Sequence, residues 1–438
     1  MNFLVIGSGA REHIIAEKLS ESGARIFSVL SNRNPGLLNL SLESFMLRDY
    51  KSVISKKLVL DFAKNNEIEC VIVGPEDPLA EGFSDLFWKS DIPVVGPIQS
   101  LARIETSKGF TRDLLKKYDI NCSPAYKRFT SMSGVKDYLE FLSSDYVVKY
   151  DGLMGGKGVK VSGEHLNSHT EALDYCQTLV SNSGDFVIEE KIFGEEFSLM
   201  SFCDGKRLSH MPVVQDHKRA YEGDLGPNTG GMGSYSDTNH SLPFLTEQDV
   251  ASAQEINERV ARSLKEEIGV GYKGVLYGGF MATNNGIKLI EYNARFGDPE
   301  VMNLLSLLNT DFAKVCFDIT SGSLSDVDFK KEASVCKYIV PEGYGVNPNK
   351  NATLIVNEDY QDFSNLYYAA VNLDGNGKIS TTSSRTAALV STSNSISTAE
   401  EKCEKGLEYI SGKNLFVRHD IAKDHLIEKR VKNMENIR

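Results

Sequence analysis

The chain has 438 residues, a length that suggests about three domains. Hydrophobic residues make up 41% and charged residues 25%, which is typical of a globular protein and excludes a disordered or fibrous one. Acidic residues outnumber basic residues by 60 to 48, giving a formal net charge of -12. Nucleic acids and anionic membranes require basic surfaces, so neither is expected as a partner. Any anionic ligand must be held by a local cluster of cations.

The sequence carries no membrane or secretion signal. No segment reaches the ~20 apolar residues of a membrane span, and the start, MNFLVIGSGAREH, lacks the basic region of a signal peptide. The 7 cysteines are scattered and form no Cys-x-x-Cys pair. This usage favours buried thiols in a reducing compartment, so a cytoplasmic protein is expected.

The first hundred residues alternate short apolar runs with helical patterns. Strands are predicted at residues 3–6, 25–30, 70–73 and 92–95, and helices up to residue 19 and over 58–64. Such alternation predicts an α/β fold with a doubly wound parallel sheet.

The remaining elements follow a different pattern. Helices are expected over 107–118, from Thr246 to Gly269 and over 398–410. Strands are expected at 146–149, 186–190, 334–340, 367–373 and 387–390. Residues 274–282 and 287–292 are expected to form a hairpin. The charged tail after Ile427 is expected to be solvated. The predicted domains are 1–103, 104–330 with a mobile lid at about 120–192, and a β-rich 331–430.

The turn after the first strand has the beginning of a dinucleotide-binding fingerprint. Gly7 and Gly9 are correctly spaced, but Glu12 stands where the third glycine belongs. No acidic residue ends the second strand at the position that would bind a ribose. A phosphate at the helix N-terminus is therefore favoured over a nicotinamide dinucleotide, and a purely structural turn is the alternative.

Two further glycine-rich segments could contact phosphates. Residues 151–158 contain Lys157 but lack the spacing of a Walker A loop. A loop of glycine and lysine can still close over a polyphosphate, although a plain hairpin loop is the alternative. Residues 215–219 and 226–233 form a polar, glycine-dense stretch that differs in composition from a surface linker.

A predicted strand at 289–295 carries three polar side chains at a spacing of two. Glu291, Asn293 and Arg295 therefore point to the same face. A carboxylate and an amide oxygen suit Mg²⁺, and a guanidinium beside them suits phosphate. A solvated outer face is the alternative.

Taken together, these segments resemble the phosphoribosylamine–glycine ligase family of the ATP-grasp superfamily over nearly the whole chain. The motifs are VIGSGAREH at the start, IVGPEDPL at 72–79, SKGFTRDLL at 107–115, VVKYDGLMGGKGV at 147–159, VIEEKIFGEEFS at 187–198, QDHKR at 215–219, GDLGPNTGGMGSYS at 223–236 and IEYNARFGDPE at 290–300. QDHKR, GPNTGGMG and NARFGDPE in this order are the most specific.

The resemblance implies a fold and a reaction. A two-lobed ATP-grasp domain would follow the N-terminal sheet and precede a small β-rich subdomain. The implied enzyme joins glycine to 5-phosphoribosylamine through glycyl phosphate and yields glycinamide ribonucleotide, ADP and phosphate in purine (IMP) biosynthesis. Mg²⁺ or Mn²⁺ is the implied cofactor, and a monomer is expected.

The resemblance also assigns residues by position. Those for the nucleotide are Lys108, Lys149, Gly155, Gly156, Lys157, Gly158, Glu189, Glu190, Lys191, Ile192 and Glu196, and those for the metal are Glu291 and Asn293. Those for the substrates are Gly9, Arg11, Glu12, Asp216, Lys218, Asn228, Thr229, Gly230, Gly231 and Arg295. The residues implied in catalysis are Arg295, Lys149 and Asp298. The strand at 274–282 departs from many ATP-grasp enzymes because it carries no acid.

Three other functions are compatible with parts of the sequence. Another ATP-grasp carboxylate–amine ligase or a carboxylase is disfavoured by QDHKR and GPNTGGMG. A dinucleotide-dependent oxidoreductase is disfavoured by the incomplete fingerprint. A non-catalytic nucleotide-binding relative is disfavoured because Lys149, Glu291, Asn293 and Arg295 are all present.

Overall fold

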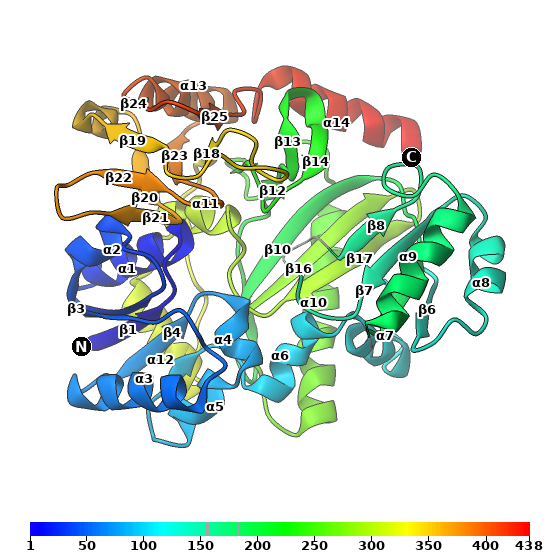
Figure 1. Ribbon diagram of the computed structural model, residues 1–438, viewed down its shortest axis with the longest axis horizontal. Coiled ribbons are helices and arrows are strands. Elements are labelled where there is room, and N and C mark those ends of the chain that lie inside the picture. Colours follow the sequence, from blue (N-terminus) through cyan, green and yellow to red (C-terminus); the bar gives the residue numbers. More distant parts are fainter. Residues whose placement is uncertain (155–157, 183) are drawn as a thin grey trace.

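The computed structural model describes residues 1–154, 158–182 and 184–438. Its N-terminal part is a parallel sheet in the order β3-β2-β1-β4-β5 (Figure 1). The strands are β1 (Asn2–Ile6), β2 (Arg25–Leu30), β3 (Ser41–Met46), β4 (Cys70–Val73) and β5 (Val94–Val95). The helices are α1 (Ala10–Glu21), α2 (Pro35–Leu40), α3 (Val53–Asn65), α4 (Glu76–Ala80) and α5 (Phe83–Trp88). Every residue of β1 and β4 is buried, as in strands covered on both faces, and the predicted doubly wound sheet is confirmed.

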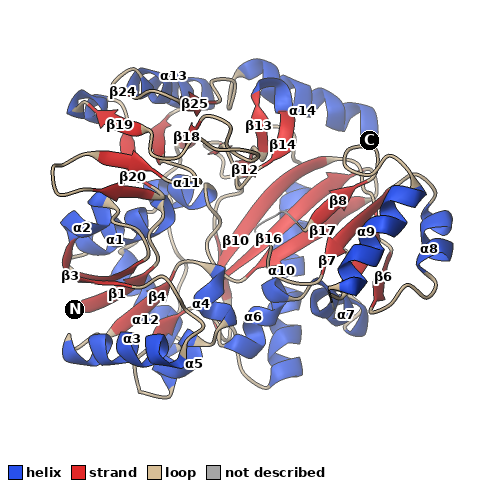
Figure 2. Ribbon diagram, viewed as in Figure 1, coloured by secondary structure: helices blue, strands red, loops and turns tan. Residues whose placement is uncertain are grey.

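Two antiparallel sheets form the middle of the chain (Figure 2). The outer sheet has the order β6-β9-β7-β8, with β6 (Tyr126–Phe129), β7 (Tyr146–Tyr150), β8 (Val159–Val161) and β9 (Phe186–Glu190). The central sheet has the order β11-β10-β16-β17, with β10 (Glu195–Asp204), β11 (Leu208–His210), β16 (Lys273–Thr283) and β17 (Gly286–Asn293). The helices here are α6 (Gln99–Thr106), α7 (Lys108–Lys117), α8 (Val135–Leu142), α9 (His169–Ser181) and α10 (Glu247–Ile268).

Local sequence signals set the borders of these elements. Thr246 and Asp249 form the predicted capping box at the start of α10, and Gly269 ends the helix in a left-handed conformation. Gly286, with a φ of 86°, turns the chain between β16 and β17. The predicted helix and hairpin are thus confirmed.

A third sheet joins the middle of the chain to its C-terminal part. Its order is β12-β15-β18-β23-β20, with β25 paired to β18. Its strands are β12 (Gln215–Asp216), β15 (Gly233–Ser236), β18 (Ala333–Pro341), β20 (Asn365–Tyr368), β23 (Ala387–Ser393) and β25 (Leu415–Val417). The other strands are β13 (Arg219–Tyr221), β14 (Leu225–Asn228), β19 (Thr353–Val356), β21 (Val371–Leu373), β22 (Ile379–Thr381) and β24 (Ile410–Ser411). The remaining helices are α11 (Glu300–Leu307), α12 (Phe312–Ser321), α13 (Ile396–Leu407) and α14 (Asp424–Ile437), with 3-10 turns at Glu222–Asp224 and Glu358–Asp362.

Two predictions for the C-terminal part need correction. The single strand expected at 367–373 is split into β20 and β21, because Ala369 and Ala370 donate their N–H groups to Thr386 and Arg385 and turn the chain into another sheet. The tail after Ile427 is solvated on one face only, because its other face packs on the protein. It forms most of α14, whose Met434 is buried and whose Arg430 pairs with Asp224, so charged residues concealed its apolar face.

Hydrophobic packing separates the outer sheet from the rest. The outer sheet, α8 and α9 have a hydrophobic cluster of their own, whereas one larger cluster runs through the N-terminal part, the central sheet and the C-terminal part.

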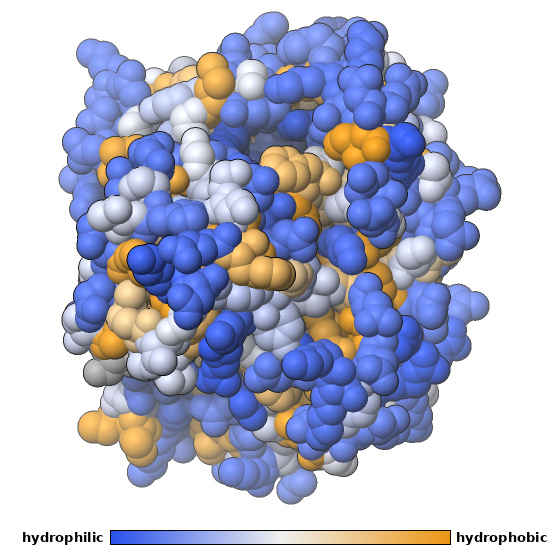
Figure 3. Space-filling model, turned by 90° about the vertical axis from the view of Figure 1, so that its right-hand side faces the viewer, coloured by the Kyte–Doolittle hydropathy of each residue, from blue (hydrophilic) through white to orange (hydrophobic). Residues whose placement is uncertain are grey.

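All 7 cysteines are buried and free of disulfides, which confirms the prediction of buried thiols. Hydrophilic residues cover most of the side of the molecule that Figure 3 shows, with apolar residues in small groups. None of the helices in the described part of the chain could span a membrane.

The stability of the contact between α1 and β20 is expected to depend on pH. Burial lowers the pKa of His13 from 6.5 to about 4, and its Nδ1 accepts the N–H of Tyr368 at 2.9 Å. Because the folded-state pKa lies below the unfolded one, this stability is present above pH 6.5 and is lost as the pH falls through about 4. A loss of about 3 kcal/mol is expected, measured by urea unfolding. His13→Asn, whose amide oxygen can replace Nδ1, should show a flatter pH dependence; an unchanged slope would contradict this assignment.

Candidate active site

A cleft of about 2110 Å³ lies between the outer sheet, the central sheet and the C-terminal part. The predicted residues that line it are Arg11, Lys108, Lys149, Glu189, Glu190, Lys191, Ile192, Glu196, Asp216, Lys218, Asn228, Thr229, Gly230, Glu291, Asn293, Arg295 and Asp298. Four other predicted residues, Gly9, Glu12, Gly158 and Gly231, are described but do not line it. Gly155, Gly156 and Lys157 lie outside the described residues.

Lys149 and Glu189 form a buried ion pair at the wall that the outer sheet provides. Lys149 Nζ lies 2.6 Å from Glu189 Oε2, and Arg112 Nε lies 2.6 Å from Glu189 Oε1. Burial alone would raise the pKa of Glu189, but Arg112 and Lys149 lower it to about 2. Burial lowers the pKa of Lys149, and Glu189 opposes this effect. The sequence places Glu189 at the nucleotide, whereas the structure commits its carboxylate to these two cations.

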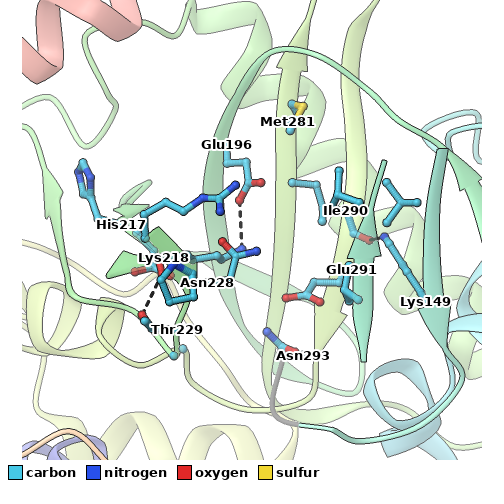
Figure 4. A pocket seen from close by; sticks show the side chains of 18 of the residues that line it. Lys149, Glu196, His217, Lys218, Asn228, Thr229, Met281, Ile290, Glu291 and Asn293 are labelled. Carbon is cyan, nitrogen blue, oxygen red and sulfur yellow. Dashed lines mark hydrogen bonds and ion pairs between the residues drawn. The ribbon is translucent and has the colours of Figure 1, made fainter. Parts of the chain in front are cut away.

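Glu291 and Asn293 project from β17 into the same part of the cleft, near Lys149 and Lys218 (Figure 4). Burial raises the pKa of Glu291, but Lys218, with further cations of the cleft, lowers it overall, so the carboxylate is ionised. None of the described residues donates a hydrogen bond to this carboxylate. The side-chain amide of Asn293 is best oriented with its nitrogen toward Glu105, to which it donates at Oε1 over 3.1 Å. This orientation leaves the amide oxygen of Asn293 free to bind a ligand.

This pair of oxygen ligands fits a divalent metal held together with phosphates. Carboxylate and amide oxygens are hard ligands, which Mg²⁺ and Mn²⁺ prefer. Within the described ranges, no group of three or more His, Cys, Asp or Glu side chains could hold a metal ion. Gly279 of β16 stands opposite Glu291 and supplies no ligand. A metal ion held by these two side chains would complete its ligand shell with phosphate oxygens and water, as is usual for Mg²⁺.

Arg295 follows β17 and is held by two carboxylates that were not among the predicted site residues. Its Nη2 lies 2.9 Å from Glu105 Oε1, and its Nε lies 3.4 Å from Glu76 Oε2. Burial raises the pKa of Glu105 to about 7, although Arg295 opposes this effect. Glu76 belongs to the motif IVGPEDPL, which was a usable signal, whereas Glu105 lies in no recognised motif.

Residues of the C-terminal part hold Asp298 and the glycine loop at 226–233. Arg385 Nη2 lies 3.0 Å from Asp298 Oδ2, and Tyr338 donates its hydroxyl hydrogen to Asp298 Oδ1 at 2.6 Å. Arg385 Nη1 also donates to the carbonyl of Gly230 at 2.6 Å. Both carboxylate oxygens of Asp298 are thus engaged. Sequence reasoning missed Arg385 and Tyr338 because residues 335–400 matched no motif.

The opposite wall carries a mixed set of charges. Lys218 Nζ lies 3.1 Å from Glu196 Oε2, and Thr229 donates its hydroxyl hydrogen to the Lys218 carbonyl at 2.9 Å (Figure 4). Asp216 Oδ1 is buried and has no hydrogen-bond partner among the described residues. Burial and the neighbouring Glu300 raise the pKa of Asp216. This wall therefore offers both an ammonium group and a carboxyl group to a ligand.

The turn before α1 is organised by Glu12. Its carboxylate accepts the N–H of Gly9 at 2.5 Å and the Nε–H of Arg11 at 2.6 Å. The Gly9 amide, expected to be free for an anion, is therefore already bonded within the turn. Glu12 holds Arg11 at the edge of the cleft instead of lining the cleft itself.

Gly74→Ala is expected to disturb this arrangement. A Cβ atom on Gly74 would lie 2.0 Å from Glu12 Oε1, so Glu12 must move and release Arg11. We expect a loss of about 1–3 kcal/mol in the free energy of unfolding and a fall in kcat/KM on the order of tenfold or more. Gly375→Ala is the control, since a Cβ there meets no atom within 4 Å. Equal kinetics for the two variants would refute the role given to Glu12.

Comparisons with known proteins agree over the whole chain. Three family models match: phosphoribosylglycinamide synthetase N domain at residues 1–105, its ATP-grasp (A) domain at 106–301 and its C domain at 334–424. The phosphoribosylamine–glycine ligase of Methanosarcina barkeri is 46% identical over 442 residues, covering 100% of both chains. The crystal structure of the phosphoribosylamine–glycine ligase of Thermotoga maritima has a TM-score of 0.81 at 25% identity, covering 96% of this chain and 100% of that one. The biotin carboxylase domain of Hydrogenobacter thermophilus 2-oxoglutarate carboxylase shares the fold, with a TM-score of 0.72 at 15% identity over 99% and 97% of the two chains.

Proposed function

Because the chain belongs to the phosphoribosylglycinamide synthetase (phosphoribosylamine–glycine ligase) family of the ATP-grasp superfamily, we propose how its cleft divides the family's reaction among its residues. The enzyme forms a C–N bond between glycine and 5-phosphoribosylamine at the expense of ATP, a step of purine biosynthesis. The fold is that of an ATP-grasp enzyme. One observation carries the assignment: Lys149, Glu291, Asn293 and Arg295 line one cleft.

The nucleotide is assigned to the side of the outer sheet. Lys108 and Lys149 contact the phosphates, and the glycine–lysine segment 155–158, of which only Gly158 is described, is assigned to the same phosphates. The backbone of residues 190–192 pairs with adenine, and Glu196 contacts the ribose. ATP-grasp enzymes use a divalent metal ion with ATP, and Glu291 and Asn293 would hold Mg²⁺ or Mn²⁺ here, which neutralises phosphate charge.

The reaction is assigned two steps. An oxygen of the glycine carboxylate attacks the γ-phosphorus, the bond to ADP breaks, and glycyl phosphate forms. The amine nitrogen of 5-phosphoribosylamine then attacks the carbonyl carbon, loses a proton and displaces phosphate. Arg295 faces the transferring phosphate, since phosphoryl transfer needs charge neutralisation and positioning more than a covalent nucleophile. Asp298 acts by positioning because both its oxygens are already engaged.

The two other substrates are assigned to the remaining walls. Arg11, Asn228, Thr229 and Gly230 bind the sugar phosphate, with Gly9, Glu12 and Gly231 supporting them from behind. Asp216 and Lys218 are the candidates for binding glycine and the amine of 5-phosphoribosylamine. We assign the three domains to residues 1–103, 104–330 and 331–430, with a mobile lid at about 120–192. We also propose that the protein is a cytoplasmic monomer without nucleic acid or membrane partners.

The release of ADP tests this function. The purified enzyme is given ATP and magnesium with glycine alone, with 5-phosphoribosylamine alone and with both. Steady release is expected only with both. No stimulation by the pair would overturn the assignment, and release with bicarbonate in place of glycine would instead indicate a carboxylase.

A further inference from the structure

Glu189 lies on the same face of the outer sheet as Lys149. In the antiparallel pair of β7 and β9, Val147 stands opposite Glu189 and Lys149 stands opposite Val187. Residues 147 and 149 point the same way, so Glu189 and Lys149 are diagonal neighbours. Their charged atoms meet at 2.6 Å. The register of the two strands thus places the pair.

Arg112 adds a second cation to this pair. Its Nε and Nη2 bind the two oxygens of Glu189 at 2.6 and 3.0 Å. The side chains of Arg112 and Glu189 are each 3% exposed, and that of Lys149 is 9% exposed. At such burial a lone ammonium group would favour its neutral form. The Glu189 carboxylate, 2.6 Å from the Lys149 ammonium group, opposes this loss of charge, and the three ionised groups together carry one net positive charge.

The same three groups connect the outer sheet to the strand that carries Glu291. Arg112 Nη2 and Lys149 Nζ both donate to the carbonyl of Ile290, at 2.9 and 3.3 Å. Ile290 precedes Glu291 in β17. Arg112 comes from α7, so one cluster joins α7, the outer sheet and the central sheet. The position of the Lys149 ammonium group is therefore fixed relative to Glu291.

We propose that Glu189 is a positioning residue: anchored by Arg112, its carboxylate holds the charged Lys149 ammonium group where the nucleotide phosphates bind. This inference rests on the proposed contact between Lys149 and the phosphates. It gives Glu189 a role through Lys149 and not through adenine. The charge of Glu189, more than its shape, is what the role requires.

Two substitutions separate charge from shape. Glu189→Gln keeps the size and removes the charge, whereas Glu189→Asp keeps the charge and shortens the side chain. The dissociation constant of MgADP, measured by calorimetry, should rise about tenfold or more for Glu189→Gln and about threefold or less for Glu189→Asp. A side chain that only filled space would give the reverse order, and that result would overturn the proposal. Asp185→Asn, a partly exposed carboxylate next to β9, is the matched control and should bind MgADP like the wild type.

Combination with Lys149→Met tests whether Glu189 acts through Lys149. In the Lys149→Met background, either Glu189 substitution should add little to the loss of MgADP affinity, whereas full additivity would overturn the proposal. If Glu189→Gln fails to fold, Glu189→Asp alone and in this background still decides the point. A Lys149→Met enzyme with normal MgADP affinity would refute the phosphate contact itself, which is a failure of the proposed function and is distinct from a failure of Glu189.

Discussion

Glu291→Gln is expected to reduce turnover by on the order of a thousandfold while the fold stays intact. The substitution keeps the size of the side chain and removes the only carboxylate of the proposed metal pair. Cations of the cleft, Lys218 foremost among them, keep the pKa of Glu291 low, so an ion is lost at neutral pH. No hydrogen bond from the described residues depends on this carboxylate. The loss should therefore be seen in kcat/KM and not in the melting temperature.

A metal titration makes this prediction sharper. The magnesium concentration that gives half-maximal activity should rise on the order of a hundredfold in Glu291→Gln. Glu255→Gln is a suitable control, because Glu255 is exposed on α10, which packs on the same sheet. Near-normal activity of Glu291→Gln would mean that the metal is held elsewhere.

Local patterns in the sequence predicted the parts of the site that lie on single elements. Glu291 and Asn293 are two residues apart on one strand, and the spacing alone places them on one face. The capping box at Thr246 and the turn at Gly286 are equally local. Parallel strands of the N-terminal sheet were visible as apolar runs, but the edge strand β3 was not, because half-exposed residues interrupt its pattern.

Contacts between distant segments could not be predicted in the same way. Glu105 pairs with Arg295, Arg112 with Glu189 and Arg385 with Asp298, and each partner lies at least 77 residues away in the chain. No periodicity links such residues, because only the packing of separate elements brings them together. Most of the residues that the sequence named therefore do line the cleft, but the residues that hold them in place were not named. Glu189 shows the consequence: its position in a motif was recognised, and its partners were not.

Arg295→Met is expected to reduce both activity and stability. Arg295 neutralises Glu105 at 2.9 Å and Glu76 at 3.4 Å, and its removal leaves two carboxylates that repel each other in a buried region. We expect a loss of about 3 kcal/mol in the free energy of unfolding at neutral pH and a fall in kcat on the order of a thousandfold. Urea unfolding and steady-state kinetics measure the two effects.

The pH dependence of Arg295→Met identifies the group responsible for its instability. In the wild type the pKa of Glu105 is about 7, raised by burial and opposed by Arg295. Without Arg295 it must rise further. Because the pKa of this carboxyl group is higher in the folded state than in the unfolded state, the folded protein binds the proton more tightly. The resulting stability is fully present below the unfolded pKa of 4.5 and is lost as the pH rises through the folded pKa. Between about pH 6 and pH 8.5, Arg295→Met should therefore lose more stability than the wild type. The double variant Arg295→Met, Glu105→Gln should not show this additional loss, because it lacks the titrating carboxyl group.

Arg295→Lys separates the structural part of this role from the chemical part. Lysine restores one positive charge beside Glu105, so most of the stability should return. It cannot supply the planar fork with which arginine binds two partners at once. Activity should thus stay at least about tenfold below that of the wild type while unfolding becomes nearly normal. Full activity in Arg295→Lys would show that a point charge suffices at the transferring phosphate, and full activity in Arg295→Met would remove Arg295 from the reaction.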